Sequence, residues 1–159
     1  KVVAALNRIC LAAERHRKVL VSGHRMESRF DSAEETIAMA TMYTANHYNV
    51  VGILSLTESG TTAKLMSRIS SGIPIYGVTR HGETQRRMSL YRGVYPLAYD
   101  ATQLPRGDVN RAVIAELESR GLVKDGDRLI ITKGDLSGVE GGTNSMKIVK
   151  VGDVVGERD

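Results

Sequence analysis

The fold is decided by twenty consecutive residues, numbers 50–69, which read VVGILSLTESGTTAKLMSRI. The apolar, β-branched run at 50–54 predicts a buried strand. Residues 63–69 predict a helix, because apolar residues such as Leu65 and Ile69 share one of its faces. The succession of strand, polar turn and helix then recurs along much of the chain.

The turn between this strand and this helix is rich in hydroxyl groups. The first N–H groups of a helix have no partner inside the helix, and the helix dipole favours negative charge there, so such a turn can bind an anion. Gly60 lets the backbone approach a ligand closely. The alternative is that the hydroxyls only cap the helix, which needs one of them. Four are present, on Thr57, Ser59, Thr61 and Thr62.

The composition fits one soluble domain, with 159 residues of which 42% are hydrophobic and 25% charged. A net charge of +4 suits an anionic small ligand or a polar interface as well as nucleic acid. The single cysteine, Cys10, excludes an intrachain disulfide and a cysteine-based zinc site, and the four histidines have no ligand spacing, so no metal site is predicted. No apolar run approaches transmembrane length and no signal peptide is visible, so we expect a cytoplasmic protein.

Strands and helices alternate until the end of the chain, where two strands follow each other directly. This order predicts an α/β fold with three αβα layers, built on an open, mostly parallel five-stranded sheet with an antiparallel last strand. Pro96 favours an edge position for its strand, or a bulge within it. Ser32 and Asp108 are predicted to cap the helices that follow them. The predicted strands are 50–54, 75–79, 94–99, 128–132 and 145–151, and the predicted helices are 1–17, 31–47, 63–69, 83–91 and 109–120.

Two polar loops, 55–62 and the glycine-rich 133–144, each follow a predicted strand. Ligands of open α/β sheets bind beyond the carboxyl ends of the strands, so both loops are expected at one rim of the sheet. The glycine-rich loop is either a flexible turn or a lid over a ligand bound at 57–62. This convergence favours the binding interpretation over simple capping.

No catalytic motif accompanies this expected site. The sequence has no Gly-x-Ser-x-Gly elbow, no Gly-x-Gly-x-x-Gly turn and no Walker lysine loop. A basic cluster has few aromatic residues beside it, which favours a solvated or subunit-facing surface over nucleic acid. It consists of Arg80, Arg86, Arg87 and Arg92. The residues therefore favour a regulatory anion-binding module without a nucleic-acid or membrane partner.

Several motifs resemble the C-terminal domain of pyruvate kinase in order and spacing. They are LTESGTTA at 56–63, PIYGVTR at 74–80, LYRGVYP at 90–96 and GTNSMKI at 142–148. The resemblance covers nearly the whole chain, and the TESG form is most similar to bacterial isozymes activated by sugar monophosphates or AMP. It implies three parts: 1–29 as the terminal helix of a preceding catalytic barrel plus a linker, 30–152 as the allosteric effector domain, and 153–159 as a tail.

The resemblance implies a larger function for the complete enzyme than for this chain. Pyruvate kinase transfers phosphate from phosphoenolpyruvate to ADP in glycolysis, with magnesium and usually potassium. Its catalytic groups and metal ligands lie in the barrel, so no catalytic residue and no cofactor is carried over, and we expect this chain to be inactive alone. The C-terminal domain binds a phosphorylated allosteric effector and forms one interface of a homotetramer.

The family's effector site can be carried over residue by residue. The phosphate is expected at Thr57, Glu58, Ser59, Gly60, Thr61 and Thr62. The covering effector loop falls on residues 133–144 and includes Lys133, Gly134, Asp135, Ser137, Gly138, Gly141 and Gly142.

Two departures from the family bear on the effector. Glu58 stands where the branch activated by fructose bisphosphate often has lysine, and its charge would repel a second phosphate. The arginine and tryptophan that hold the second phosphate in that branch have no clear match, although Arg106 and Arg111 are candidate substitutes. We therefore expect a monophosphate effector such as glucose 6-phosphate, ribose 5-phosphate or AMP.

Two alternatives stay open at the level of sequence. One is a freestanding α/β phosphate-ester-binding module or enzyme, which a barrel encoded directly upstream of Lys1 would exclude. The other is a nucleic-acid-binding domain, which predicts salt-sensitive retention on heparin or DNA.

Overall fold

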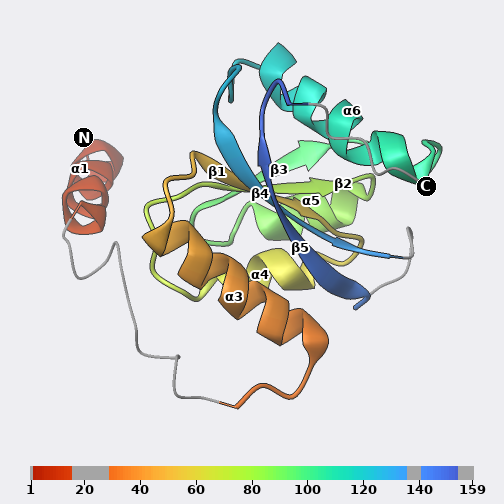
Figure 1. The fold of residues 1–159 in the computed structure, drawn as a ribbon. Helices are drawn as coiled ribbons and strands as arrows, with labels where there is room; N and C mark the ends of the chain where they lie inside the picture. Colours follow the sequence, from red (N-terminus) through yellow and green to blue (C-terminus); the bar gives the residue numbers. More distant parts are fainter. Residues whose placement is uncertain (1, 16–28, 136–140, 154–159) are drawn as a thin grey trace.

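The computed structural model describes residues 2–15, 29–135 and 141–153 of the chain, and its centre is one five-stranded sheet (Figure 1). The strand order is β3-β2-β1-β4-β5. The first four strands pair in parallel, and β5 pairs antiparallel to β4. The strands are β1 (Gly52–Leu56), β2 (Ile75–Thr79), β3 (Val94–Ala98), β4 (Arg128–Gly134) and β5 (Thr143–Lys150). The predicted α/β fold is confirmed, and Pro96 lies on edge strand β3, as predicted.

Helices cover both faces of the sheet, because successive strand residues point to opposite sides. Leu54 packs with Val113 and Leu117 of α6 (Arg106–Ser119). Its neighbour Ile53 packs on the other face with Met42. That second face carries α3 (Ala33–His47), α4 (Thr61–Ser67) and α5 (Gly82–Met88). The three αβα layers are therefore present (Figure 1), and each fully buried aliphatic side chain contributes about 1.5–3 kcal/mol to them.

Helix α1 (Val2–Glu14) lies beside these layers and belongs to neither of the two hydrophobic cores. Four of its apolar side chains stay 55–79% exposed. They are Val2, Val3, Leu6 and Ile9. Such a helix is amphipathic without a described partner for its apolar face, and its assignment to a preceding barrel stays a prediction.

The predicted strand boundaries beside the polar loops were wrong by about two residues. Ser55 and Leu56 belong to β1, because their pairing continues to Thr132 and Val78. Ser55 is fully buried and is not part of the polar turn. At the other loop, β4 extends to Gly134 and β5 begins at Thr143. The part of each loop that lies between the elements is therefore shorter than the sequence predicted.

The helix starts were predicted with mixed success. Ser32 caps α3, and its hydroxyl accepts a hydrogen bond of 3.1 Å from the N–H of Glu35. The prediction that Asp108 caps the helix now labelled α6 was wrong, because α6 begins at Arg106, directly after Pro105. The Pro105 carbonyl accepts the N–H of Asp108, which places Asp108 in the first turn. On the other helices, α4 starts two residues earlier than predicted, and α1 and α5 are shorter.

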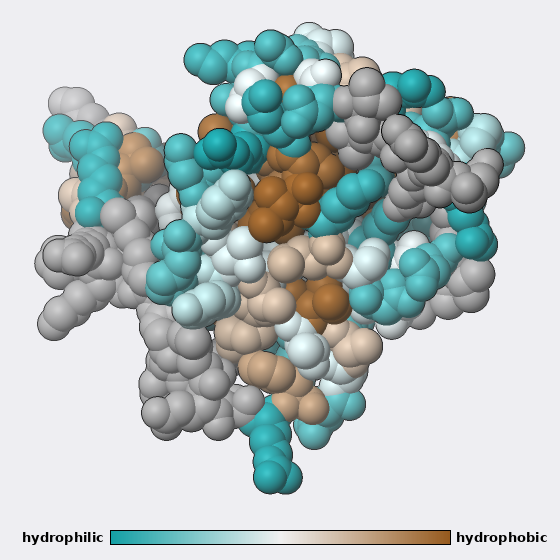
Figure 2. Space-filling view, in the orientation of Figure 1, coloured by the Kyte–Doolittle hydropathy of each residue, from teal (hydrophilic) through white to brown (hydrophobic). Residues whose placement is uncertain are grey.

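Strand β5 forms an edge of the sheet. Its residue Ile148 stays 44% exposed. Figure 2 shows apolar surface over the sheet between α6 and α3. Edge strands with apolar side chains are natural places for another chain to pair. Within the described ranges, every helix is too short or too polar to cross a membrane.

Candidate functional site

A cavity of about 180 Å³ opens beyond the carboxyl ends of the parallel strands. Each neighbouring strand contributes the residues that follow it: Glu58 after β1, Arg80 after β2, Asp100 after β3 and Asp135 after β4. The start of α6 adds Arg106. The cavity therefore lies where an open α/β sheet is expected to bind a ligand.

The predicted phosphate loop reaches this cavity only in part. Thr57 and Glu58 line it, whereas the four residues from 59 to 62 are not among the lining residues. The loop hydroxyls instead hold the loop together. The hydroxyl of Thr57 accepts the N–H of Gly60 at 2.9 Å, and the hydroxyl of Ser59 accepts the N–H of Thr61 at 3.4 Å. The residue that precedes α4 is Gly60, and no side-chain hydrogen bond caps this helix, so the hydroxyls stabilise the turn and do not cap the helix as the simpler interpretation expected.

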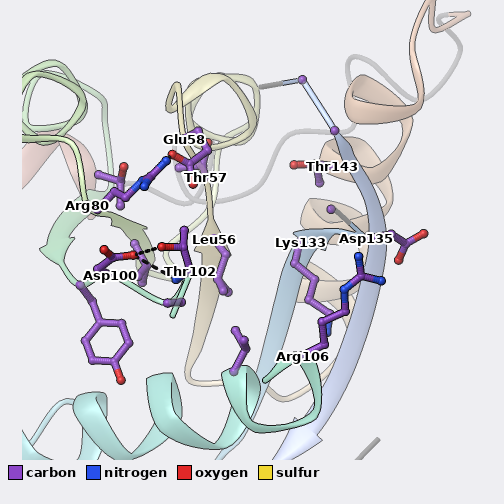
Figure 3. A pocket seen from close by; sticks show the side chains of 18 of the residues that line it. Leu56, Thr57, Glu58, Arg80, Asp100, Thr102, Arg106, Lys133, Asp135 and Thr143 are labelled. Carbon is purple, nitrogen blue, oxygen red and sulfur yellow. Dashed lines mark hydrogen bonds and ion pairs between the residues drawn. The ribbon is translucent and has the colours of Figure 1, made fainter. Parts of the chain in front are cut away.

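Glu58 makes an ion-paired cluster at the cavity rim. One of its oxygens, Oε2, lies 2.5 Å from Nε2 of His81 and 3.2 Å from Nε of Arg80. Its side chain is only 16% exposed. The negative charge of Glu58 is therefore compensated by Arg80, and Arg80 is held beside it (Figure 3).

Asp100 is a second carboxylate at the rim, held in its ionised form by its surroundings. The hydroxyl of Thr102 donates to it at 2.6 Å and the N–H of Thr102 at 3.0 Å. These hydrogen bonds lower the pKa of Asp100 from its usual value, and the charges of Arg80 and His81 lower it further. Asp100 is therefore a permanent hydrogen-bond acceptor near neutral pH.

The remaining cations lie on another side of the cavity. Figure 3 shows Arg106 and Lys133 near one another, away from Arg80 and Glu58. In contrast, Arg111 pairs with Asp108 on the exposed surface of α6 and does not line the cavity. Of the two candidate second contacts, the structure brings only Arg106 to the site.

The predicted effector loop also contributes, as far as it is described. Lys133, Gly134, Asp135, Gly141 and Gly142 all line the cavity. The carboxylate of Asp135 accepts a hydrogen bond of 2.8 Å from Asn144. Residues 137 and 138, a serine and a glycine of the predicted site, lie outside the described residues. The two loops predicted from sequence therefore meet in one cavity.

The cavity carries both signs of charge. Its three cations face four carboxylates, on Glu34, Glu58, Asp100 and Asp135. Across the described residues, no group of three or more His, Cys, Asp or Glu side chains is arranged to hold a metal ion. Cations bind phosphate, and carboxylates accept hydrogen bonds from hydroxyl groups, so the arrangement suits a ligand that carries both.

Some lining residues were not predicted from sequence. Arg80 and Asp100 follow β2 and β3, so the rule that ligands bind at strand ends would have indicated them. Thr143 begins β5 and was treated as part of a loop. Glu34 gave no signal, because an acid in the first turn of a helix is already explained by the helix dipole.

Comparison with known proteins gives one consistent result. Residues 35–149 match the family model described as pyruvate kinase, alpha/beta domain. Pyruvate kinase II of Salmonella typhimurium is 43% identical over 152 residues, which cover 95% of this chain and 32% of that protein. The pyruvate kinase of Haemophilus influenzae is 39% identical, covering 84% and 28% respectively. That of Staphylococcus aureus strain USA300 is 35% identical, covering 91% and 24%. The chain spans a third or less of the length of these curated relatives.

Proposed function

The chain belongs to the pyruvate kinase family, in which it corresponds to the alpha/beta domain, and we propose that it binds a phosphorylated effector in the cavity at the strand ends. One observation carries this proposal. The hydroxyl-rich loop and the glycine-rich loop, which are more than seventy residues apart in the sequence, line the same cavity together with Arg80 and Arg106.

The charges of the cavity support a monophosphate ligand with free hydroxyl groups. Arg106 and Lys133 lie on the side away from Glu58 and are suited to a phosphate. Asp100 and Glu34 are suited to accept hydrogen bonds from sugar hydroxyls. We therefore propose glucose 6-phosphate, ribose 5-phosphate or AMP as the kind of effector, rather than a sugar bisphosphate.

The proposed role of this domain is regulation within a larger enzyme. We assign phosphate transfer from phosphoenolpyruvate to ADP, with its magnesium and potassium, to a catalytic barrel. Residues 1–29 would be the last helix of that barrel plus a linker, and residues 30–152 the effector domain. An effector that binds one arrangement of a homotetramer more tightly shifts the population toward it. The exposed β5 edge near Ile148 supports a subunit interface. We also propose that the protein is cytoplasmic and that residues 153–159 form a tail.

Titration calorimetry of residues 1–159 tests the binding site directly. We expect glucose 6-phosphate, ribose 5-phosphate or AMP to bind. The affinity for fructose 1,6-bisphosphate should be no higher than the affinity for these monophosphates. Arg106→Ala should weaken the monophosphate about tenfold or more, since a hydrogen bond to a charged group contributes about 1.5–3 kcal/mol. Arg111→Ala is the matched control on the same helix, and it should leave the affinity unchanged, because Arg111 does not line the cavity.

The outcomes separate the parts of this proposal. If no phosphate ester binds, the effector site is refuted. If fructose 1,6-bisphosphate binds tightly while no monophosphate responds, the site stands but the proposed ligand class is wrong. If Arg106→Ala and Arg111→Ala weaken binding equally, the ligand does not occupy this cavity.

A further inference from the structure

Helix α5 supports the loop between β1 and α4 through the side chain of Thr84. The hydroxyl of Thr84 donates to the main-chain carbonyl of Glu58 at 2.9 Å, although the two residues are 26 positions apart. Its methyl group lies close to Gly60, where an added β-carbon would be 3.2 Å from it. Thr84 is only 3% exposed. Both branches of this one side chain therefore contact the loop.

The direction of the hydrogen bond follows from the chemistry of the two groups. A carbonyl oxygen can only accept, so the single hydroxyl hydrogen of Thr84 is used on Glu58. The hydroxyl oxygen in turn accepts a hydrogen bond of 3.4 Å from Nη2 of Arg87. The carboxylate of Glu58 is held as well, because Nε2 of His81, directly before α5, contacts it. Glu58 is thus restrained at its main chain and at its side chain.

Fixing the Glu58 carbonyl also fixes the N–H group that follows it. The two groups belong to one planar trans peptide unit, in which they point in opposite directions. Because the carbonyl points toward α5, the N–H of Ser59 points away from α5. Ser59 is only partly buried, and its N–H forms no hydrogen bond within the described residues. The turn therefore presents a main-chain donor whose direction Thr84 sets, and such donors bind anionic oxygens.

We propose that Thr84 is a positioning residue of the effector site, which aims the N–H of Ser59 at an oxygen of the ligand's phosphate. Thr84 does not line the cavity, so it acts through the loop and not by touching the ligand. The inference rests on the proposed phosphate-ester site, with the phosphate expected at residues 57–62. It adds the side chain outside the loop that orients the loop for binding.

A simpler role for Thr84 would be to tie α5 to the loop for stability alone. Thr84→Val distinguishes the two roles, because valine keeps the branched shape beside Gly60 and removes only the hydroxyl. Thr84→Ser keeps the hydroxyl and removes the methyl group. Thr41→Val is the matched control, since Thr41 is also fully buried but lies in α3 and does not line the cavity.

The first measurement is calorimetry of residues 1–159 with two probes, glucose 6-phosphate and inorganic phosphate. Thr84→Val should weaken both probes about tenfold, because the phosphate is their common part and loses one aligned hydrogen bond. Thr84→Ser should restore most of the affinity, and Thr41→Val should leave both affinities unchanged.

The second measurement is amide NMR of the same chain, which reads the loop directly. In the unmodified chain, each probe should shift the Ser59 amide proton downfield, as a new hydrogen bond to phosphate does. Thr84→Val should lose this shift even when saturated with ligand, whereas Thr84→Ser and Thr41→Val should keep it. A role in stability alone would leave the Ser59 shift of every folded, saturated variant unchanged.

The outcomes separate this inference from the site on which it rests. If a probe binds the unmodified chain without shifting Ser59, or if Thr84→Val binds both probes as tightly as the unmodified chain does, the positioning role is refuted and the phosphate-ester site remains. If Thr84→Val does not fold, which thermal unfolding would reveal, the Ser59 shift in the unmodified chain and in Thr84→Ser decides the inference. If neither probe binds the unmodified chain, the site and the inference both fail.

Discussion

Gly60→Ala should destabilise the domain more than an ordinary glycine substitution. Gly60 precedes α4 with a φ of +80°, where a side chain is strained by about 1–2 kcal/mol. A β-carbon there would also lie 3.1 Å from Cγ of Met88 and 3.2 Å from Cγ2 of Thr84. Met88 is fully buried and Thr84 is 3% exposed, so neither can move freely aside. Crowding of this kind costs about 1–3 kcal/mol.

Gly121→Ala is the matched control for this prediction. Gly121 has a φ of +68°, but among the described residues nothing lies within 4 Å of its would-be β-carbon. Both substitutions stiffen the unfolded chain, which offsets about 0.4–1 kcal/mol of the strain. We therefore expect a loss of about 1 kcal/mol for Gly121→Ala and of about 2–4 kcal/mol for Gly60→Ala.

Urea denaturation followed by far-ultraviolet circular dichroism measures both free energies of unfolding. Gly60→Ala should also weaken sugar-phosphate binding, because the N–H of Gly60 donates to Thr57 in the loop that borders the cavity. Equal losses for the two variants would show that Met88 and Thr84 relax without cost, and would refute the close packing that we infer behind the loop.

Three further predictions follow from single residues. Thr132→Val should raise the free energy of unfolding by about 1 kcal/mol, because the hydroxyl of Thr132 is buried without a hydrogen-bond partner among the described residues; an unchanged or lower value would contradict this. The Asp100 carboxyl should titrate below 3.8 by NMR, and Thr102→Val should raise its pKa. The pKa of Asp100 is lower in the folded state than in the unfolded state. Its stabilising contribution is therefore complete above pH 3.8 and is lost as the pH falls through the folded-state pKa. Glu58→Lys should increase the affinity for fructose 1,6-bisphosphate relative to glucose 6-phosphate, measured by calorimetry, whereas an unchanged ratio would remove Glu58 from ligand selection.

The order of the elements was predictable from the sequence because each has a local signal. The β-branched run before Ser55, the cap at Ser32 and the proline at position 96 each act within a few residues. The boundaries were less predictable, since pairing with neighbouring strands carries β1 on to Leu56. A strand ladder continues while partners exist, and the partners of Leu56 are distant in sequence.

The site was predictable where it follows strands and unpredictable where it depends on long-range contacts. Two loops after strands were expected at one rim, and both line the cavity there. The bond between Thr62 and Glu34 joins residues 28 positions apart, and that between Thr62 and Thr143 joins residues 81 apart. No local pattern encodes such pairs, and Thr62, whose contact with the ligand stays a prediction, is not among the residues that line the cavity.

The pairing of Glu58 changes how this residue would select a ligand. From the sequence, its carboxylate is expected to repel a second phosphate directly. In the structure, Arg80 and His81 contact that carboxylate, and paired opposite charges attenuate its field at longer range. We infer that Glu58 acts mainly by engaging Arg80, which then has less capacity to bind phosphate. A lysine at position 58 would change the lining from three cations against four carboxylates to four against three, and would also release Arg80. Both changes favour a second phosphate, so we expect this one substitution to alter the preferred ligand charge through two effects.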